Sequence, residues 1–225
     1  MRRAWIALLL VACGSRPPPV APPGLDAEEV DEDGPRIAGI ELPRLPVDVT
    51  PEDEPLREGW ALTEQALTMP APRPPTGEEW EVETWADDAL GDWMQRRGQA
   101  IASAQRALDG ARHGRADYSV VASMLLGLAY ARFAMDLRGL ETPEVFQQDP
   151  ERAHAYRAAM ETAAEPLWQR ALDAFGSCAS VAHRQPAHSL DRWRERCDQE
   201  GREAAAMLPD DEEEEEEEAP RRPRH

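Results

Sequence analysis

Two cysteines near the C-terminus constrain the fold of this chain more than any other feature. Cys178 and Cys197 each lie in a helical pattern, and the polar stretch 183–189 separates the two patterns. The midpoint between the cysteines falls inside this stretch. If 183–189 is the turn of an antiparallel helical hairpin, residues equally far from the turn face each other, as a disulfide requires. The segment 165–208 is therefore predicted to be a helical hairpin with a cysteine on each arm.

The distribution of charge and proline indicates one folded domain between two disordered arms. The chain has 225 residues, 21 prolines and a formal net charge of −19, with 41% hydrophobic residues. Prolines and charges concentrate in the flanks, which leaves the middle of the chain apolar enough to form a core. The excess of 44 acids over 25 bases argues against a nucleic-acid partner, because binding the phosphate backbone needs a cationic face.

The first residues have the pattern of a secretion signal. Arg2 and Arg3 form a cationic start, and the apolar run 5–11 is too short to span a bilayer. We expect a signal peptide over 1–12. The four residues Leu10-Val11-Ala12-Cys13 resemble a bacterial lipobox, at which lipoproteins are cleaved and acylated. An ordinary signal peptide with an incidental cysteine is the alternative.

The lipobox resemblance has implications for the location of the protein. It implies that Cys13 becomes the first residue of the mature chain, with diacylglycerol on its thiol and a fatty acid such as palmitate on its amine. Gly14, in place of aspartate, resembles the pattern that sorts lipoproteins to the outer membrane. The expected partner of Cys13 is therefore a lipid membrane, with the rest of the chain facing the periplasm. Cleavage also removes Arg2 and Arg3, which changes the formal charge from −19 to −21.

Residues 13–75 are predicted to form the lipid anchor and an extended tether. Clusters of proline and an acidic run at 26–33 leave few apolar residues to offset the entropy of ordering. Two pieces, 37–49 and 60–67, carry enough apolar residues that docking on the folded domain stays open. The acidic tail 209–225, with seven consecutive glutamates, is predicted to be disordered.

Helical spacing of apolar residues predicts an all-α domain over 76–208. Thr76 and Glu79 have the spacing of a capping box before a long helix that reaches about His113. Its apolar series includes Val82, Trp85, Ala89 and Trp93. Trp80, Trp85 and Trp93 are interpreted as core residues and not as an aromatic ligand platform.

The second half of this domain is predicted to contain three further helices. The apolar stretch 117–137 lacks the alternation of a strand and predicts a buried central helix. Asp149 and Pro150 begin a helix toward Ala182, in which Pro166 predicts a kink or break at 163–165. A last helix is expected from Ser189 to Leu208, before Pro209. These helices are expected to form an antiparallel bundle or a series of repeated hairpins.

Some of these helical residues resemble parts of a tetratricopeptide repeat. Leu126-Gly127 with Tyr130, and Ala171 with Phe175 and Cys178, are similar to pieces of its two helices, although no 34-residue period links them. The segment from Glu165 to Cys197 resembles the C-terminal part of tetratricopeptide-like outer-membrane lipoproteins of gliding and predatory high-GC bacteria. The resemblance implies a helical scaffold with envelope partners and no catalytic residues.

The pairing of Cys178 with Cys197 follows from the expected export of the chain. If Cys13 carries lipid, an even pair of cysteines remains in an oxidising compartment. Both cysteines continue the apolar stripe of their own helix, so both are expected at the seam of the hairpin. Trp193, one turn before Cys197, is expected to pack near Ala174 and Phe175. Intermolecular pairing and two buried free thiols are the alternatives.

Residues for catalysis or cofactor binding are harder to find. His154, His183 and His188 lack the two-ligands-per-helix spacing of a zinc site, so exposed histidines are the preferred interpretation and no metal is expected. The chain has no glycine-rich phosphate loop and no nucleophile elbow. The run of glutamates lacks the arranged ligands of a calcium site. We therefore expect no enzyme, no cofactor and no catalytic residue.

Two functions from different classes are consistent with the sequence. The first is a membrane-anchored lipoprotein that acts as a non-catalytic protein-interaction scaffold in the bacterial cell envelope, with a protein or peptide partner. The alternative is an envelope enzyme or metal-dependent binding protein with a site between the helices. Convergent buried carboxylates and histidine beside a pocket would favour the alternative, whereas a shallow apolar groove would favour the scaffold.

Overall fold

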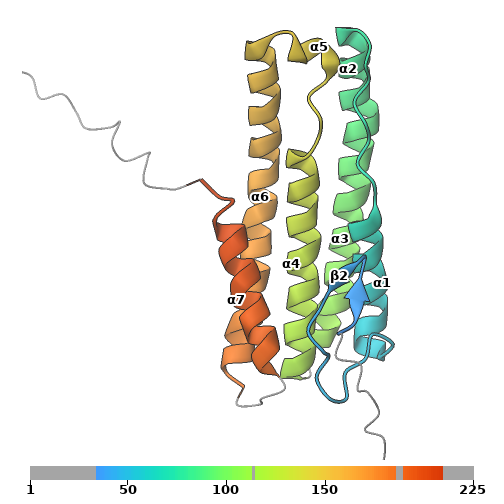
Figure 1. Cartoon of the computed structure of the whole chain (residues 1–225). Coiled ribbons are helices and arrows are strands. Elements are labelled where there is room, and N and C mark those ends of the chain that lie inside the picture. The colour runs from blue at the N-terminus through green and yellow to red at the C-terminus, as the bar shows by residue number, and fades with distance from the viewer. Residues whose placement is uncertain (1–33, 113–114, 186–189, 210–225) are drawn as a thin grey trace, which may run out of the picture. The chain divides into compact units, whose positions relative to one another are not determined.

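The computed structural model describes residues 34–112, 115–185 and 190–209, and over them the fold is all-α, as predicted (Figure 1). The signal peptide, Cys13, His188, Ser189 and the tail from residue 210 lie outside the described residues. The elements are β1 (Arg36–Ile37), β2 (Ile40–Glu41), α1 (Glu54–Thr68), α2 (Glu79–Trp85), the π-helix η1 (Ala86–Leu90), α3 (Gly91–Arg112), α4 (Ala116–Arg138), α5 (Glu144–Gln147), α6 (Pro150–His183) and α7 (Asp191–Ala205).

Helix α4 lies at the centre of the bundle, which confirms the prediction for 117–137. It contacts α1, α3, α6 and α7. Its apolar residues are buried around most of its circumference, as a central helix requires. By length and hydropathy α4 is also able to cross a membrane, but 83% of its apolar window is buried inside the bundle. Burial on this scale is typical of the core helix of a globular domain.

The long helices pack as an antiparallel bundle, in which α3, α4, α6 and α7 alternate in direction (Figure 1). Helix α6 alone spans 34 residues, the length that two helices and a turn occupy in a tetratricopeptide repeat. Of the two architectures expected for the all-α domain, the described residues form the antiparallel bundle.

Helix α6 passes through Pro166 without interruption, so the break predicted at 163–165 does not occur. Pro166 lies on the exposed face of the helix. The carbonyl of Thr162, which loses its usual donor at Pro166, therefore faces water and not the core. At the start of the helix, Asp149 accepts hydrogen bonds from the backbone of Glu151 and Arg152, which confirms the predicted N-terminus.

The helix predicted from Thr76 to about His113 is present, but it differs in two details. It begins at Glu79, and the N-cap residue Glu78 makes no side-chain capping bond, so the predicted capping box is wrong. The π-turn η1 then shifts the buried face by one residue, which buries Leu90 and exposes Ala89. In a π-turn the residues at i and i+5, here Trp85 and Leu90, share one face.

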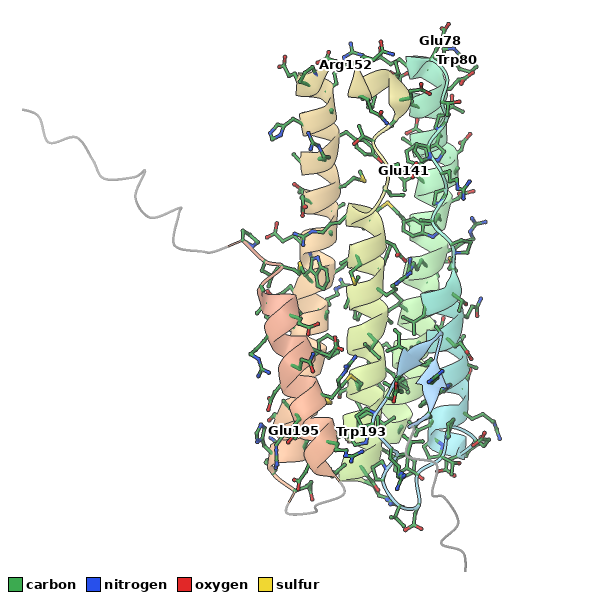
Figure 2. All side chains as sticks on the ribbon, viewed as in Figure 1. Glu78, Trp80, Glu141, Arg152, Trp193 and Glu195 are labelled. Atoms are coloured by element: carbon green, nitrogen blue, oxygen red, sulfur yellow. A yellow bond between two sulfur atoms is a disulfide. The ribbon has the colours of Figure 1, made fainter. Side chains whose placement is uncertain are left out.

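The three tryptophans of this helix divide between core and surface. Trp85 and Trp93 are buried, as predicted, whereas Trp80 in the first turn is 60% exposed. Figure 2 places Trp80 and Arg152 at the same end of the bundle. There Arg152 Nη1 pairs with Glu79 Oε2 at 2.7 Å, which links the N-termini of α2 and α6.

The predicted tether over 13–75 is wrong for its described part, because residues 34–75 belong to the fold. β1 and β2 form a two-residue hairpin in which Ala38 and Gly39 have positive φ, as the right-handed twist of such a hairpin favours. Ile37, Leu42 and Val49 enter the core. Helix α1 follows and packs on α3 and α4 through Leu56 and other buried residues. Docking of 37–49 and 60–67, which the sequence left open, is thereby confirmed.

Gly127 of α4 lies in close contact with α6. A Cβ atom at this position would overlap the ring of Phe175, so the missing side chain lets the helices approach. We predict that Gly127→Ala lowers the free energy of unfolding by about 1–3 kcal/mol through overpacking. Gly176→Ala in α6, whose added Cβ has no atom within 4 Å, is predicted to raise it by about 0.5–1 kcal/mol. Urea denaturation of both variants tests this, and changes of the same sign would contradict the close approach.

Candidate functional site

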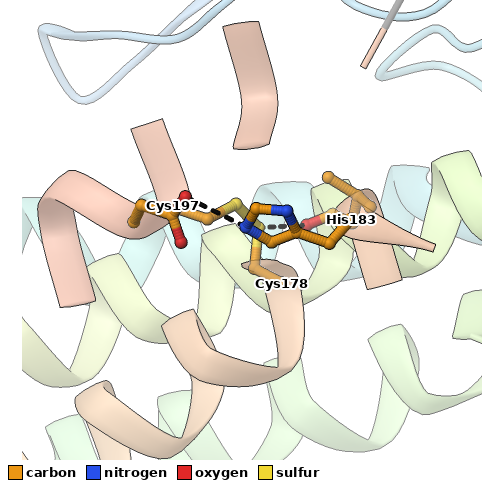
Figure 3. The surroundings of a disulfide bond; sticks show 5 residues. Cys178, His183 and Cys197 are labelled. Carbon is orange, nitrogen blue, oxygen red and sulfur yellow. Dashed lines mark hydrogen bonds and ion pairs between the residues drawn. A yellow bond between two sulfur atoms is a disulfide. The ribbon is translucent and has the colours of Figure 1, made fainter. Parts of the chain in front are cut away.

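The C-terminal hairpin has the geometry that the sequence predicted. The Cα atoms of Cys178 in α6 and Cys197 in α7 are 5.8 Å apart, and their sulfurs are at the disulfide-bonding distance of 1.92 Å (Figure 3). Both residues are fully buried. The pair fixes α7 along the lower half of α6 (Figure 1).

The expected packing of Trp193 on Ala174 and Phe175 is wrong. In an antiparallel hairpin, a step of one turn back from Cys197 along α7 corresponds to a step forward from Cys178 along α6, toward the connecting turn. Trp193 therefore lies nearer the end of α6, whereas Gly201, one turn after Cys197, lies against Phe175. The buried Trp193 instead donates from Nε1 to the carbonyl of Arg44 at 2.9 Å, which ties α7 to the N-terminal segment.

The described histidines are separated in space. His154 and His183 are 29 positions apart on α6, which corresponds to roughly 43 Å along the helix. Both are exposed, and His183 Nε2 lies 3.1 Å from Asp198 Oδ2 beside the disulfide (Figure 3). Within the described ranges, no group of three His, Cys, Asp or Glu residues is placed to hold a metal ion.

An apolar groove of about 320 Å³ lies where α4, α6 and α7 meet. Its floor includes Trp168 and Phe175, and two unusually exposed methionines flank it, Met135 at 52% and Met207 at 43%. We name it the methionine groove; its lining consists of Ala131, Met135, Arg138, Trp168, Phe175, Glu200, Glu203, Ala204 and Met207. Flexible thioether side chains adapt to partner surfaces of different shape. The groove is therefore suited to receive apolar side chains.

Arg138 holds the three helices together at one end of the groove. Its guanidinium pairs with Glu161 of α6 and lies 5.7 Å from the ring centre of Trp168. Nη2 also donates to the carbonyl of Met207 at 2.9 Å, just beyond the end of α7. These contacts fix the position of Met207 relative to α4 and α6, so this end of the groove is formed before any ligand arrives.

The opposite side of the groove is acidic. Glu200 pairs with Arg196 at 2.6 Å, and its side chain is only 13% exposed. Burial raises the pKa of Glu200 despite this ion pair. Glu203 accepts a hydrogen bond from Gln199 at 2.9 Å and forms no ion pair with a described residue. The groove thus combines an apolar floor with one carboxylate, that of Glu203, which no cation of the described residues neutralises.

A second groove, of about 430 Å³, lies on the other side of the seam between α4 and α6 and is polar. Tyr130 Oη donates to Gln105 Oε1 at 3.1 Å, and Arg170 lies 5.7 Å from the ring centre of Tyr130. Arg112 also lines this groove and pairs with Asp109 at 3.4 Å. These contacts use several of its polar groups within the fold, and its lining is less apolar, so the methionine groove is the better candidate for a site that binds apolar side chains.

With this geometry established, the chain can be compared with known proteins. No protein-family model, curated protein or solved structure matches it. The candidate site therefore depends on the contacts described above.

Sequence reasoning did not identify the methionine groove. Met135 lies in the stretch 117–137, which predicts a buried helix because no periodicity of polar residues marks an exposed face. Met207 follows the last helix, where no pattern predicts its contacts. The available signal was residue type and position: each of the two residues is a methionine near the end of a helical segment.

Proposed function

We propose that this protein is a membrane-anchored lipoprotein of the bacterial envelope that acts as a non-catalytic scaffold and binds a partner protein or peptide in the methionine groove. The observation that carries the binding role is the exposure of Met135 and Met207 over an apolar floor. Exposed apolar patches of this kind are costly in water and characterise sites of interaction.

The location in this proposal rests on the sequence. The lipobox-like residues Leu10-Val11-Ala12-Cys13 support the anchor, and the buried cysteine pair suits an oxidising compartment. Twenty residues separate Cys13 from Gly34, the first described residue.

The alternative, an envelope enzyme or metal-dependent binding protein, has one observation in its favour. Glu200 lies partly buried at the methionine groove with a raised pKa, as a general acid does. Its ion pair with Arg196 gives it a structural role, and the lining residues include no histidine or nucleophile to act with it. The scaffold is therefore the preferred function.

Lipidation at Cys13 is the first expected result. Growth of a producing bacterium with a radioactive fatty acid should label the wild-type chain and leave Cys13→Ala unlabelled and uncleaved. Cys178→Ala, which removes a different cysteine, serves as the control and should be labelled. Label on Cys13→Ala would disprove the anchor and place the protein elsewhere.

Use of the groove is tested separately in living cells. A photo-crosslinking amino acid at Met135 should form adducts with a discrete envelope protein. The same group at Val47, which is 79% exposed and lies outside the groove, should not form these adducts. Equal adducts from both positions, or none from Met135, would contradict the binding role of the groove.

A further inference from the structure

We infer that the partner of the methionine groove is a cationic amphipathic helix, whose apolar residues insert between Met135 and Met207 and whose basic residues face Glu203. This inference rests on the proposed binding role and specifies the chemistry of the occupant. Apolar grooves between helices commonly receive the apolar face of a partner helix.

The floor and walls of the groove define the apolar half of this recognition. Trp168 and Phe175 provide aromatic area at the bottom, and Ala131 and Ala204 leave space between the walls. A volume of about 320 Å³ takes one or two large aliphatic side chains and not a whole helix. The partner therefore lies across the opening, with its anchors inserted at one or two turns.

Charge determines which amphipathic helix fits. Of the charged residues that line the groove, Arg138 is paired with Glu161 and Glu200 with Arg196, so Glu203 presents the unbalanced charge. Pro209 lines the adjoining cleft together with Met207. From Pro209 the sequence continues into Asp210, Asp211 and seven glutamates. A basic partner is attracted by the carboxylate of Glu203, and an acidic one is repelled.

The experiment uses two acetylated, fluorescein-labelled 18-residue helices as probes, one of leucine and lysine and one of leucine and glutamate. Fluorescence anisotropy with the full chain in 150 mM salt, where long-range attraction is screened, gives the dissociation constants. We expect the lysine peptide to bind and the glutamate peptide to bind at least about tenfold more weakly.

Met207→Asp tests whether the lysine peptide binds in the methionine groove or only to the acidic tail. This substitution adds negative charge, so binding to charge alone would become tighter. Loss of an apolar anchor should instead weaken binding of the lysine peptide by about tenfold or more. Val47→Asp makes the same kind of change outside the groove and should leave the affinity within about twofold of wild type. Equal or tighter binding by Met207→Asp would overturn the inference.

Glu203→Gln tests the charged half of the recognition. Removal of its charge should weaken binding of the lysine peptide by about fivefold, the equivalent of one exposed ion pair. If both peptides bind equally and Met207→Asp weakens both, the groove binds apolar helices without charge selection; the inference then fails while the proposed function stands.

The oligomeric state supplies a further test. A dimer of the wild-type chain that Met207→Asp dissociates in analytical ultracentrifugation would also overturn the inference, since a second copy would then be the occupant.

Discussion

Asp136→Ala is expected to lower the free energy of unfolding by about 3–5 kcal/mol, the largest loss among the substitutions considered for this bundle. Arg97 of α3 is completely buried, and its Nη1 donates to Asp136 Oδ2 of α4 at 2.6 Å. Removal of the carboxylate leaves a guanidinium in the core without a counter-charge. Urea denaturation with circular dichroism detection measures the effect.

The environment of Arg97 explains why this loss should be large. Its guanidinium lies 5.4 Å from the ring centre of Trp93 and 5.1 Å from that of Phe133, so the aromatic rings replace water around it. Its Nε and Nη2 have no hydrogen-bond partner among the residues that the structure describes, and burial lowers the pKa of Arg97. Asp136 therefore supplies the stabilising contact that keeps this side chain charged in the core.

A double substitution distinguishes loss of the ion pair from a general disturbance of α4. Arg97→Met with Asp136→Ala removes both charges and fills the buried site with an apolar chain of similar length. It should recover most of the stability, because replacement of a buried ion pair by apolar residues is often neutral. Asp198→Ala, which breaks the exposed pair with His183, is the surface control and should cost less than about 1 kcal/mol. A double variant no more stable than Asp136→Ala would contradict the explanation.

The elements that could be predicted from sequence are those whose pattern is local. The bounds of α4 and the beginning of α6 follow from an apolar run and from Asp149-Pro150, and both agree with the structure within a residue or two. The cysteine pair was also predictable. The two cysteines lie nearly equally far from the turn, so an antiparallel hairpin places them opposite each other.

The N-terminal part of the bundle was missed because prolines and charges dominate its composition. Ile37, Leu42 and Leu56 are separated by polar residues, so their local density resembles that of a disordered segment. Their burial depends on a surface that α3 and α4 provide elsewhere in the chain. Composition measures what a segment is able to bury alone, and it cannot detect a surface supplied by another segment.

The burial of Arg97 is predictable from its spacing along α3. It lies four residues after Trp93 and four before Ile101, so helical periodicity alone places it on the buried face. A charge at such a position needs a partner on a neighbouring helix. The identity of that partner depends on how α3 packs against α4, which the sequence of one helix does not determine.

Replacement of both Cys178 and Cys197 by alanine is expected to lower the free energy of unfolding by about 3 kcal/mol. The crosslink closes a loop over a sequence separation of 19, and constraint of the unfolded chain by a loop of this size accounts for about that amount. Urea denaturation of the oxidised wild type and the double variant measures the difference.

Reduction supplies the matched control for this disulfide. Wild type in excess dithiothreitol should lose nearly the same stability as the double variant, whereas the double variant should be unaffected by reductant. Loss of the crosslink should also free α7, which carries Glu203 and ends beside Met207, and so weaken peptide binding in the methionine groove. Because α7 contacts α4 only slightly compared with α6, its position depends mainly on the hairpin seam. Equal stability of wild type with and without reductant would mean that the cysteines are not bonded to each other in the folded protein, and that the packing and hydrogen bonds of α7 suffice to hold it.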